Sequence, residues 1–212
     1  MLEKEINLFW KWAKLTPQQY EAGKKPDHIR QNPWHDSYPD WKNMEVAFDK
    51  EIVKYNSDLN EMSAQLILEA LAIDSESELL LQKIIKNLDN MAQIHLSSEG
   101  SRFYMSGARW QIAEFLKEAK VPDKKELLSK MVLNDANKYV QRRALLSLQT
   151  VDPFLTEEYA FQKLNDEDEY IRLVSIRILK DLKSKKIDQA KGMLKGDIST
   201  LIQKELNQLN NP

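Results

Sequence analysis

The side chains best suited to acid–base or metal chemistry in this chain are its three histidines, His28, His35 and His95. Two of them, His28 and His35, share a proline-rich segment with several aspartates. Imidazole and carboxylate groups together are common ligands of zinc and related ions. The spacing of these residues matches no known ligand motif, however. We therefore predict solvent-exposed or turn-capping roles for them and no metal site.

No motif for covalent catalysis or phosphate binding accompanies the histidines. No serine lies in the glycine-flanked turn typical of a nucleophile. The chain has only five glycines, and neither a phosphate-binding loop nor a dinucleotide fingerprint is present. It has no cysteine, which excludes disulfides and thiolate metal sites. We predict no catalytic residue and no cofactor.

Composition favours a helical, soluble protein. The net charge of −2 creates no overall field that would attract nucleic acid or an anionic membrane. Charged residues interrupt the apolar residues of the first fourteen positions, unlike a signal peptide, and no stretch reaches the roughly 18 apolar residues of a membrane span. Few glycines and abundant Leu, Lys, Glu, Ala and Ile predict an all-α fold. We expect a cytoplasmic protein that does not bind membranes.

An internal repeat is the most informative pattern in the chain. The segment Asp135–Leu148 aligns with Asp166–Leu179, with corresponding positions 31 residues apart. A third copy, Arg109–Leu116, aligns with Arg172–Leu179. A fixed period of this length is the signature of stacked supersecondary units.

Apolar residues in each copy recur at spacings of three and four. Val140, Ala144, Leu145 and Leu148 fall on one stripe of a helix, as do the aligned residues of the next copy. One hairpin alone cannot bury such a stripe. Neighbouring helical hairpins must therefore stack on one another.

The pattern resembles the HEAT-like repeat family, in the short form found in phycobilisome-lyase-type repeats. The shared features are an aspartate in the turn, as at Asp135 and Asp166, and an arginine near the start of the following helix, as at Arg109 and Arg172. Gln141 stands where one such arginine is expected. In the family, the turn aspartate and the helix arginine bond between successive repeats, so the resemblance implies structural roles for these four residues.

The resemblance covers residues 102–183 and implies an α-solenoid. We expect a solenoid over residues 58–212 and a divergent helical cap over residues 1–57, whose helices are Leu2–Leu15 and Trp41–Tyr55. The other expected helices span Asp58–Ala72, Glu76–Ile94, Lys124–Leu133, Leu155–Leu164, Lys186–Leu194 and Ile198–Leu209, in addition to those of the repeats.

One enzymatic alternative follows from the same resemblance, because a family of alkylpurine DNA glycosylases is also built from HEAT-like repeats. Trp110 and Glu114 would lie on one face of a helix and resemble the aromatic and carboxylate residues of such a site. Residues 102–183 carry fifteen basic and thirteen acidic residues. Docking a duplex requires an uncompensated basic surface, so nucleic acid is the less favoured partner.

A protein-binding scaffold or adaptor is the favoured function, with a protein or peptide held on the concave surface of the solenoid. Small helical-repeat proteins of this size also act as immunity proteins that neutralise toxins. Candidate contacts on the second helices have mixed charge, which suits a protein better than a polyanion. They are Lys124, Lys125, Glu158, Tyr159 and Gln162.

Aromatic residues crowd the segment Gly23–Trp41, which three prolines punctuate. Trp34, His35, Tyr38 and Trp41 have two interpretations. They cover the exposed apolar end of the first repeat, or they form an anchoring patch for the partner.

Overall fold

The computed structural model describes residues 1–23, 37–74 and 78–210 of the chain. These residues form thirteen α-helices and no strand, and helix covers 78% of them. The predicted all-α class is confirmed. Within the same residues, no helix combines the length and apolar character needed to cross a membrane.

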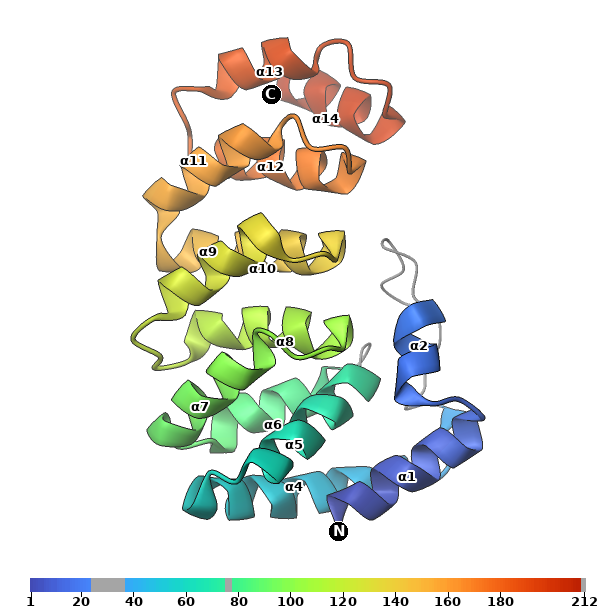
Figure 1. The fold of residues 1–212 in the computed structure, drawn as a ribbon. Helices are drawn as coiled ribbons and strands as arrows, with labels where there is room; N and C mark the ends of the chain where they lie inside the picture. Colours follow the sequence, from blue (N-terminus) through green and yellow to red (C-terminus); the bar gives the residue numbers. More distant parts are fainter. Residues whose placement is uncertain (24–36, 75–77, 211–212) are drawn as a thin grey trace. The chain divides into compact units, whose positions relative to one another are not determined.

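Two compact units make up the chain, Met1–Leu127 (unit 1) and Leu128–Pro212 (unit 2). Residues 1–57, which we expected to form a helical cap, belong to the same unit as residues 58–127. Figure 1 labels the helices of both units.

The central element of unit 1 is the helix α5 (Glu61–Ile73), which contacts α1, α4, α6, α7 and α8 (Figure 1). The α5 sequence explains this position, because Ile67, Ala72 and Ile73 lie on different faces of the helix and all are buried. The other helices of unit 1 are α1 (Leu2–Ala13), α2 (Pro17–Gly23), α4 (Trp41–Asp58), α6 (Leu79–Asn87), α7 (Asn90–Gly100) and α8 (Ser106–Glu118).

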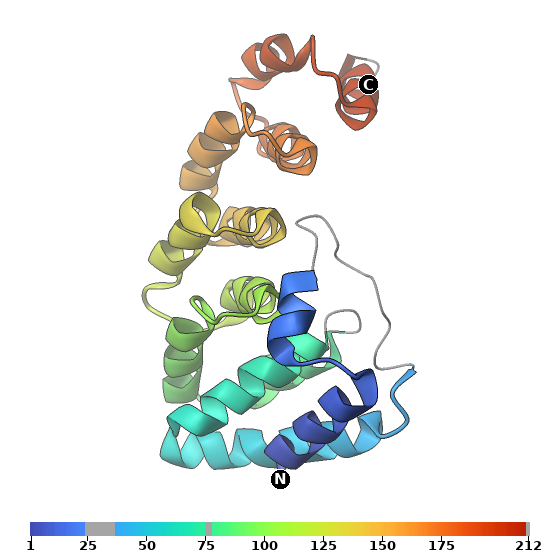
Figure 2. The same cartoon turned by 45° about the vertical axis from the view of Figure 1, so that its right-hand side comes forward.

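Unit 2 consists of two layers of helices. One layer contains α10 (Lys138–Val151), α12 (Glu169–Asp181) and α14 (Thr200–Asn210), with α12 in contact with both others. In the second layer, α11 (Pro153–Lys163) packs on α10 and α12, and α13 (Ile187–Leu194) packs on α12 and α14. Figure 2 shows α11 beside the pair formed by α10 and α12. The helix α9 (Lys124–Asn134) contains the boundary between the units.

The apolar stripes of the two best repeats are buried, as predicted. Leu145 of α10 is 1% exposed and Ile176 of α12 is 0% exposed. Each stripe faces the helices of the neighbouring hairpin, which explains why the apolar residues recur with the helical period.

The expected helix Glu76–Ile94 is wrong, because two helices, α6 and α7, occupy this region. The chain leaves α6 at Leu88, whose backbone is extended, and Asp89 then caps α7 by accepting the backbone N–H of Ala92 at 2.9 Å. The cap at Asp89 therefore starts a second helix at a point where the apolar periodicity predicted one continuous helix.

Two helix starts also differ from expectation. The expected helix Leu155–Leu164 begins two residues earlier, because Asp152 caps α11 by accepting the backbone N–H of Leu155 at 3.0 Å and Pro153 takes the first helical position. The short helix α2 was not expected at all. Thr16 and Gln19 form a capping box at its start, since each side chain accepts the other's backbone N–H.

Candidate protein-binding surfaces

A repeated turn precedes each helix of the first layer of unit 2. The side chains of Asp135, Asp166 and Asp197 each accept the backbone N–H two residues ahead, at 2.8, 3.1 and 2.8 Å. The turns occur every 31 residues, so the repeat that the sequence showed twice is present three times in unit 2. The copy that begins at Asp197 was missed in the sequence, because the apolar stripe of α14 differs from the stripes of α10 and α12.

A second polar contact joins each turn to its helix. Gln141, Arg172 and Gln203 donate a side-chain hydrogen bond to the carbonyl oxygen of the turn aspartate six residues earlier, at 2.6, 2.8 and 2.8 Å. In unit 1, Arg109 donates to the carbonyl oxygen of Phe103 at 2.8 Å, again six residues earlier. Glutamine can replace arginine here because a single N–H donor suffices for this bond.

Two ion pairs link the turns of unit 2 along the chain. Arg172 of α12 forms a bidentate pair with Asp197, at 2.6 and 2.9 Å, and this pair lowers the pKa of the Asp197 carboxyl. Lys138 of α10 contacts Asp166 at 2.8 Å. Burial acts to raise the Asp166 pKa, but hydrogen bonds led by that from Lys138 bring it below its ordinary value. These aspartates are engaged by cations and backbone amides, which gives them structural roles.

The Tyr–Arg cluster, formed by Tyr139, Arg142, Arg143 and Tyr170, lies where α10 meets the start of α12. The Arg142 guanidinium carbon is 5.3 Å from the Tyr139 ring centroid and 4.8 Å from that of Tyr170. Arg143 lies 5.8 Å from the Tyr139 ring. Cation–π contacts of this geometry hold both rings and cations in place. Tyr139 and Tyr170 occupy equivalent positions, 31 residues apart, on adjacent helices.

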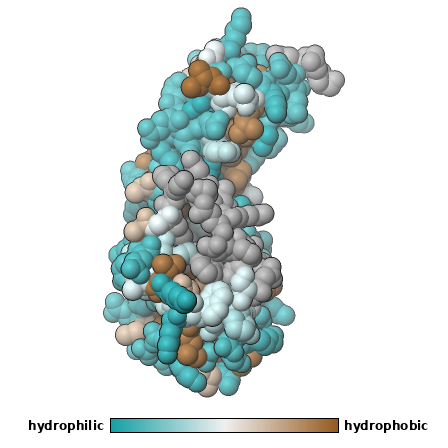
Figure 3. Space-filling model, turned by 90° about the vertical axis from the view of Figure 1, so that its right-hand side faces the viewer, coloured by the Kyte–Doolittle hydropathy of each residue, from teal (hydrophilic) through white to brown (hydrophobic). Residues whose placement is uncertain are grey.

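Both tyrosines of the Tyr–Arg cluster remain partly accessible, and Tyr170 is 39% exposed. The side of the molecule drawn in Figure 3 is mainly hydrophilic over unit 2, with separate hydrophobic patches. The sequence did not single out this cluster. The available signal was Tyr139 followed by Arg142 and Arg143 at the helical spacing of three and four, with Tyr170 at the position equivalent to Tyr139 in the next repeat.

The residues expected to contact a partner have mixed positions. Lys124 donates to the carbonyl oxygen of Ala119 at 3.2 Å, at the end of α8, whereas Lys125 is exposed. The helix α11 carries the other three, with Glu158 and Gln162 exposed and Tyr159 partly exposed.

The aromatic segment before α4 is only partly described. Tyr38 is 4% exposed and Trp41 is 6% exposed, and the Tyr38 ring packs edge-on against Phe9 of α1 at 5.3 Å. These two side chains belong to the core of unit 1 and present little surface to a partner. Trp34 and His35 lie outside the described residues, as does His28.

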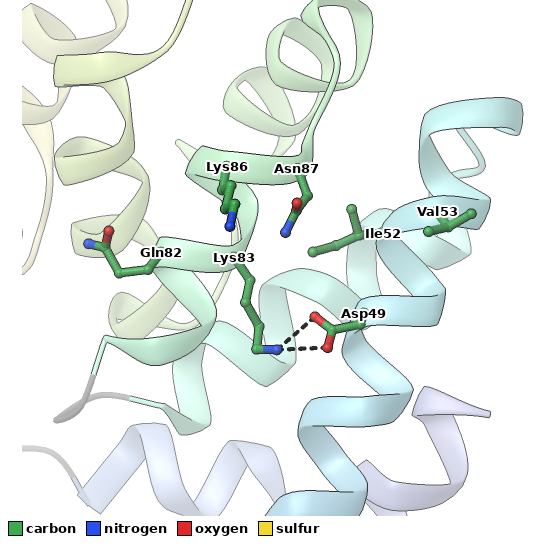
Figure 4. Close-up of a pocket in the computed structure, with 7 residues that line it drawn as sticks. All are labelled: Asp49, Ile52, Val53, Gln82, Lys83, Lys86 and Asn87. Carbon is green, nitrogen blue, oxygen red and sulfur yellow. Dashed lines mark hydrogen bonds and ion pairs between the residues drawn. The ribbon is translucent and has the colours of Figure 1, made fainter.

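A groove between α4 and α6 of unit 1 encloses about 570 Å³. We name it the α4–α6 groove. Figure 4 shows Lys83 reaching Asp49 across it, with Nζ 2.7 and 2.8 Å from the two carboxylate oxygens. This ion pair neutralises one of the two lysines of the groove. The lining consists of Asp49, Ile52, Val53, Gln82, Lys83, Lys86 and Asn87.

The pair that suggested a DNA glycosylase site is buried. Trp110 is 4% exposed and Glu114 is 9% exposed, and Glu114 pairs with Lys117 one turn along α8. A glycosylase must stack a flipped base on an accessible aromatic ring beside a reactive carboxylate. Neither side chain offers that surface here.

Two titratable side chains of unit 1, Glu69 and Tyr104, have raised pKa values. Burial raises the pKa of Glu69, although a hydrogen bond from Trp10 Nε1 at 2.6 Å acts in the opposite direction. Burial, together with the charges of Glu69 and Glu21, raises the pKa of Tyr104 to about 12. Glu69 links α1 to α5 through Trp10, which is a packing role.

Among the described residues, no group of three or more His, Asp or Glu side chains is placed to hold a metal ion. The third histidine, His95, shares a hydrogen bond of 2.6 Å with the buried Tyr55 hydroxyl inside unit 1. Comparison of the chain with protein-family models, with curated proteins and with solved structures gives no match.

Proposed function

We propose that this protein is a non-catalytic, cytoplasmic protein-binding scaffold whose helical hairpins form a HEAT-like solenoid. The Tyr–Arg cluster is the observation that carries the proposal. Tyrosine and arginine are the residue types most enriched among the side chains that dominate binding energy at protein interfaces. Here they are gathered on two adjacent helices, with one tyrosine well exposed.

Preorganisation supports the same function. Tyr139 is held on its helix and stacks on both Arg142 and Arg143, so little of its side-chain entropy remains to be lost on binding. The turn hydrogen bonds of Asp135 and Asp166 precede the start of each helix, and the tyrosine is the second residue of that helix. The cluster therefore stands on a backbone that is ordered before the partner binds, as a scaffold requires.

The charges around the cluster favour a protein partner over a nucleic acid. Arg177 of α12 is paired with Glu205 of α14 at 2.6 Å, and Lys180 approaches the same carboxylate. Phosphate-backbone binding requires a continuous row of uncompensated cations. The DNA glycosylase alternative gains no support, because Trp110 and Glu114 are buried.

A pull-down with the whole chain as bait tests the proposal. A protein retained from the source cell is identified, purified and titrated against the wild type and the double variant Tyr139→Ser/Tyr170→Ser. We expect affinity to fall at least 100-fold with no change in helix content. Such a loss corresponds to about 2.7 kcal/mol, within the range of two hot-spot residues.

The matched control is Tyr159→Ser on α11, in the second layer, which should bind as the wild type does. If the double variant binds equally well and Tyr159→Ser does not, the partner surface lies on α11, as the sequence suggested. If no retained protein binds the purified chain directly, the scaffold function is wrong.

A further inference from the structure

Arg142 is an unusual residue within the Tyr–Arg cluster because its charge is almost completely buried. The residue is 4% exposed, whereas arginine is rarely buried to this extent unless it is paired. Its Nη1 atom lies 3.6 Å from Oδ1 of Asp168. That separation is beyond a hydrogen bond, so the pairing is weak.

Asp168 is also committed elsewhere. Its Oδ1 atom caps α12 by accepting the backbone N–H of Ile171 at 2.7 Å. Helix capping holds the carboxylate at the start of α12, where it lies 3.6 Å from Arg142 Nη1. The guanidinium is therefore held near a carboxylate that it does not fully engage.

The Nη2 atom of Arg142 is buried and has no hydrogen-bond partner. A buried donor without a partner is unfavourable, and more so on a charged group. The rings of Tyr139 and Tyr170 and the carboxylate of Asp168 surround the cation, and none of them accepts a hydrogen bond from Nη2. A planar group with two acceptor oxygens would satisfy it far better, because the guanidinium fork matches a carboxylate in geometry.

Tyr170 controls access to this cation. Its ring lies 4.8 Å from the guanidinium carbon, yet the residue is 39% exposed. Rotation of the ring into solvent would uncover Arg142, with loss of one cation–π contact. A hydrogen-bonded ion pair formed in its place is the stronger interaction when both groups are desolvated.

Charges of both signs lie near Arg142, among them the acidic run 166–169 that directly precedes Tyr170. Arg143 is its chain neighbour and adds a second positive charge beside Tyr139. The nearest carboxylate, Asp168, is the capping residue.

We propose that Arg142 is the anchor for a carboxylate of an acidic protein segment, which enters as the Tyr170 ring moves aside. This inference rests on the proposed scaffold function and specifies the chemistry of its partner. The segment places a glutamate or aspartate side chain on Nη1 and Nη2 of Arg142. Its apolar atoms cover the displaced ring.

The probe is the capped peptide acetyl-Glu-Glu-Glu-Glu-amide, with acetyl-Gln-Gln-Gln-Gln-amide as the uncharged control. Binding to the whole chain is followed by NMR signals of the arginine side chains and tyrosine rings. We expect the acidic peptide alone to shift the Arg142 and Tyr170 signals. Arg142→Met should weaken peptide binding at least tenfold, whereas Lys195→Met, which removes an exposed charge outside the cluster, should change it less than twofold.

Arg142→Lys keeps the charge but loses the planar fork, so it should bind the peptide as poorly as Arg142→Met does. Equal weakening in Arg142→Met and Lys195→Met would overturn the proposal, because binding would then be nonspecific. A single-stranded oligonucleotide that binds through Arg142 more tightly than the peptide would also overturn it.

The inference and the proposed function fail in different ways. If the identified partner loses affinity with Tyr139→Ser/Tyr170→Ser but not with Arg142→Met, the scaffold function stands and the carboxylate anchor is wrong. If the peptide binds at Arg142 but the identified partner binds Tyr139→Ser/Tyr170→Ser as tightly as the wild type, the carboxylate anchor stands and the proposed interface is wrong.

Discussion

Unit 1 and unit 2 are both helical, but different interactions position their helices. In unit 2, the turn aspartates and the side chains six residues later repeat every 31 residues. The described residues of unit 1 contain one such side-chain bond, that of Arg109. A cluster of aromatic rings instead joins α1 to the rest of the unit. Phe9 contacts Trp10 at 4.9 Å, Trp12 at 5.9 Å and Tyr38 at 5.3 Å.

This difference shows that the two units differ in the sequence separation of the residues that contact one another. The turn contacts of unit 2 join residues two to six positions apart, so they leave a periodic sequence pattern. The aromatic cluster of unit 1 joins α1 to residues near α4 across about thirty positions, without a period. Repeated units can therefore be read from sequence, whereas a unit closed by nonlocal packing cannot.

The largest effect should come from a charge in the stacked core of unit 2. Ile176→Asp buries a carboxylate at a position that is 0% exposed, which costs about 3 kcal/mol or more. We expect amide hydrogen exchange to show loss of protection throughout α10–α14 and retention in α5 and α8. Phe154→Asp, at a residue that is 84% exposed, is the control and should leave protection unchanged. Equal loss in both units would mean that they fold as one.

An effect of similar size is expected at the centre of the aromatic cluster of unit 1. Phe9→Ala removes a fully buried ring and should lower the free energy of unfolding by about 3–5 kcal/mol. Trp12→Ala, at a residue that is 37% exposed, should lower it by less. Denaturant titration of both variants measures the difference. Equal values would place Trp12, rather than Phe9, at the energetic centre of the cluster.

Loss of a turn-linking ion pair in unit 2 should have a moderate effect. Arg172→Met removes the bidentate bond to Asp197 and the bond to the carbonyl oxygen of Asp166. We expect a loss of about 1–3 kcal/mol in the stability of unit 2. Arg172→Gln should recover part of it, because Gln141 makes the same carbonyl contact in the preceding repeat. A glutamine variant no better than methionine would show that the carbonyl bond contributes nothing.

Acid should weaken unit 2 through the same pair. The hydrogen bond from Arg172 lowers the pKa of Asp197 below its unfolded value of about 3.9. The carboxylate thus stabilises the fold above about pH 4, and this stabilisation is lost as pH falls through the folded pKa. We expect Asp197→Asn to be less stable than wild type at pH 7 and to lose less stability between pH 4 and pH 2. Parallel pH profiles would contradict this assignment.

The smallest effect is expected on the exposed side of α11. Glu158→Ala should change the free energy of unfolding by less than about 0.5 kcal/mol, because Glu158 is exposed. Thermal unfolding of this variant provides the baseline for the other four measurements. A large destabilisation would show that α11 packs through a different side.

The sequence alone was enough to determine the helical class and the buried stripes of α10 and α12, because helix propensity and the period of 3.6 residues are local properties. It also located the turns at Asp135 and Asp166. It missed the break between α6 and α7, where one capping bond from Asp89 outweighs continuous apolar periodicity. It missed α2 although Thr16 and Gln19 carried a recognisable capping box.

Only the tertiary structure decided which side chains are available for binding. Tyr38 and Trp41 were candidate contacts by residue type, yet both are buried in unit 1. Tyr139, Tyr170 and Arg142 became a cluster because stacking places α10 beside α12 and brings together positions 31 residues apart. The exposure of a side chain and the residues it contacts depend on which helices pack together. The packing of the helices is set by nonlocal contacts, which no single stretch of sequence contains.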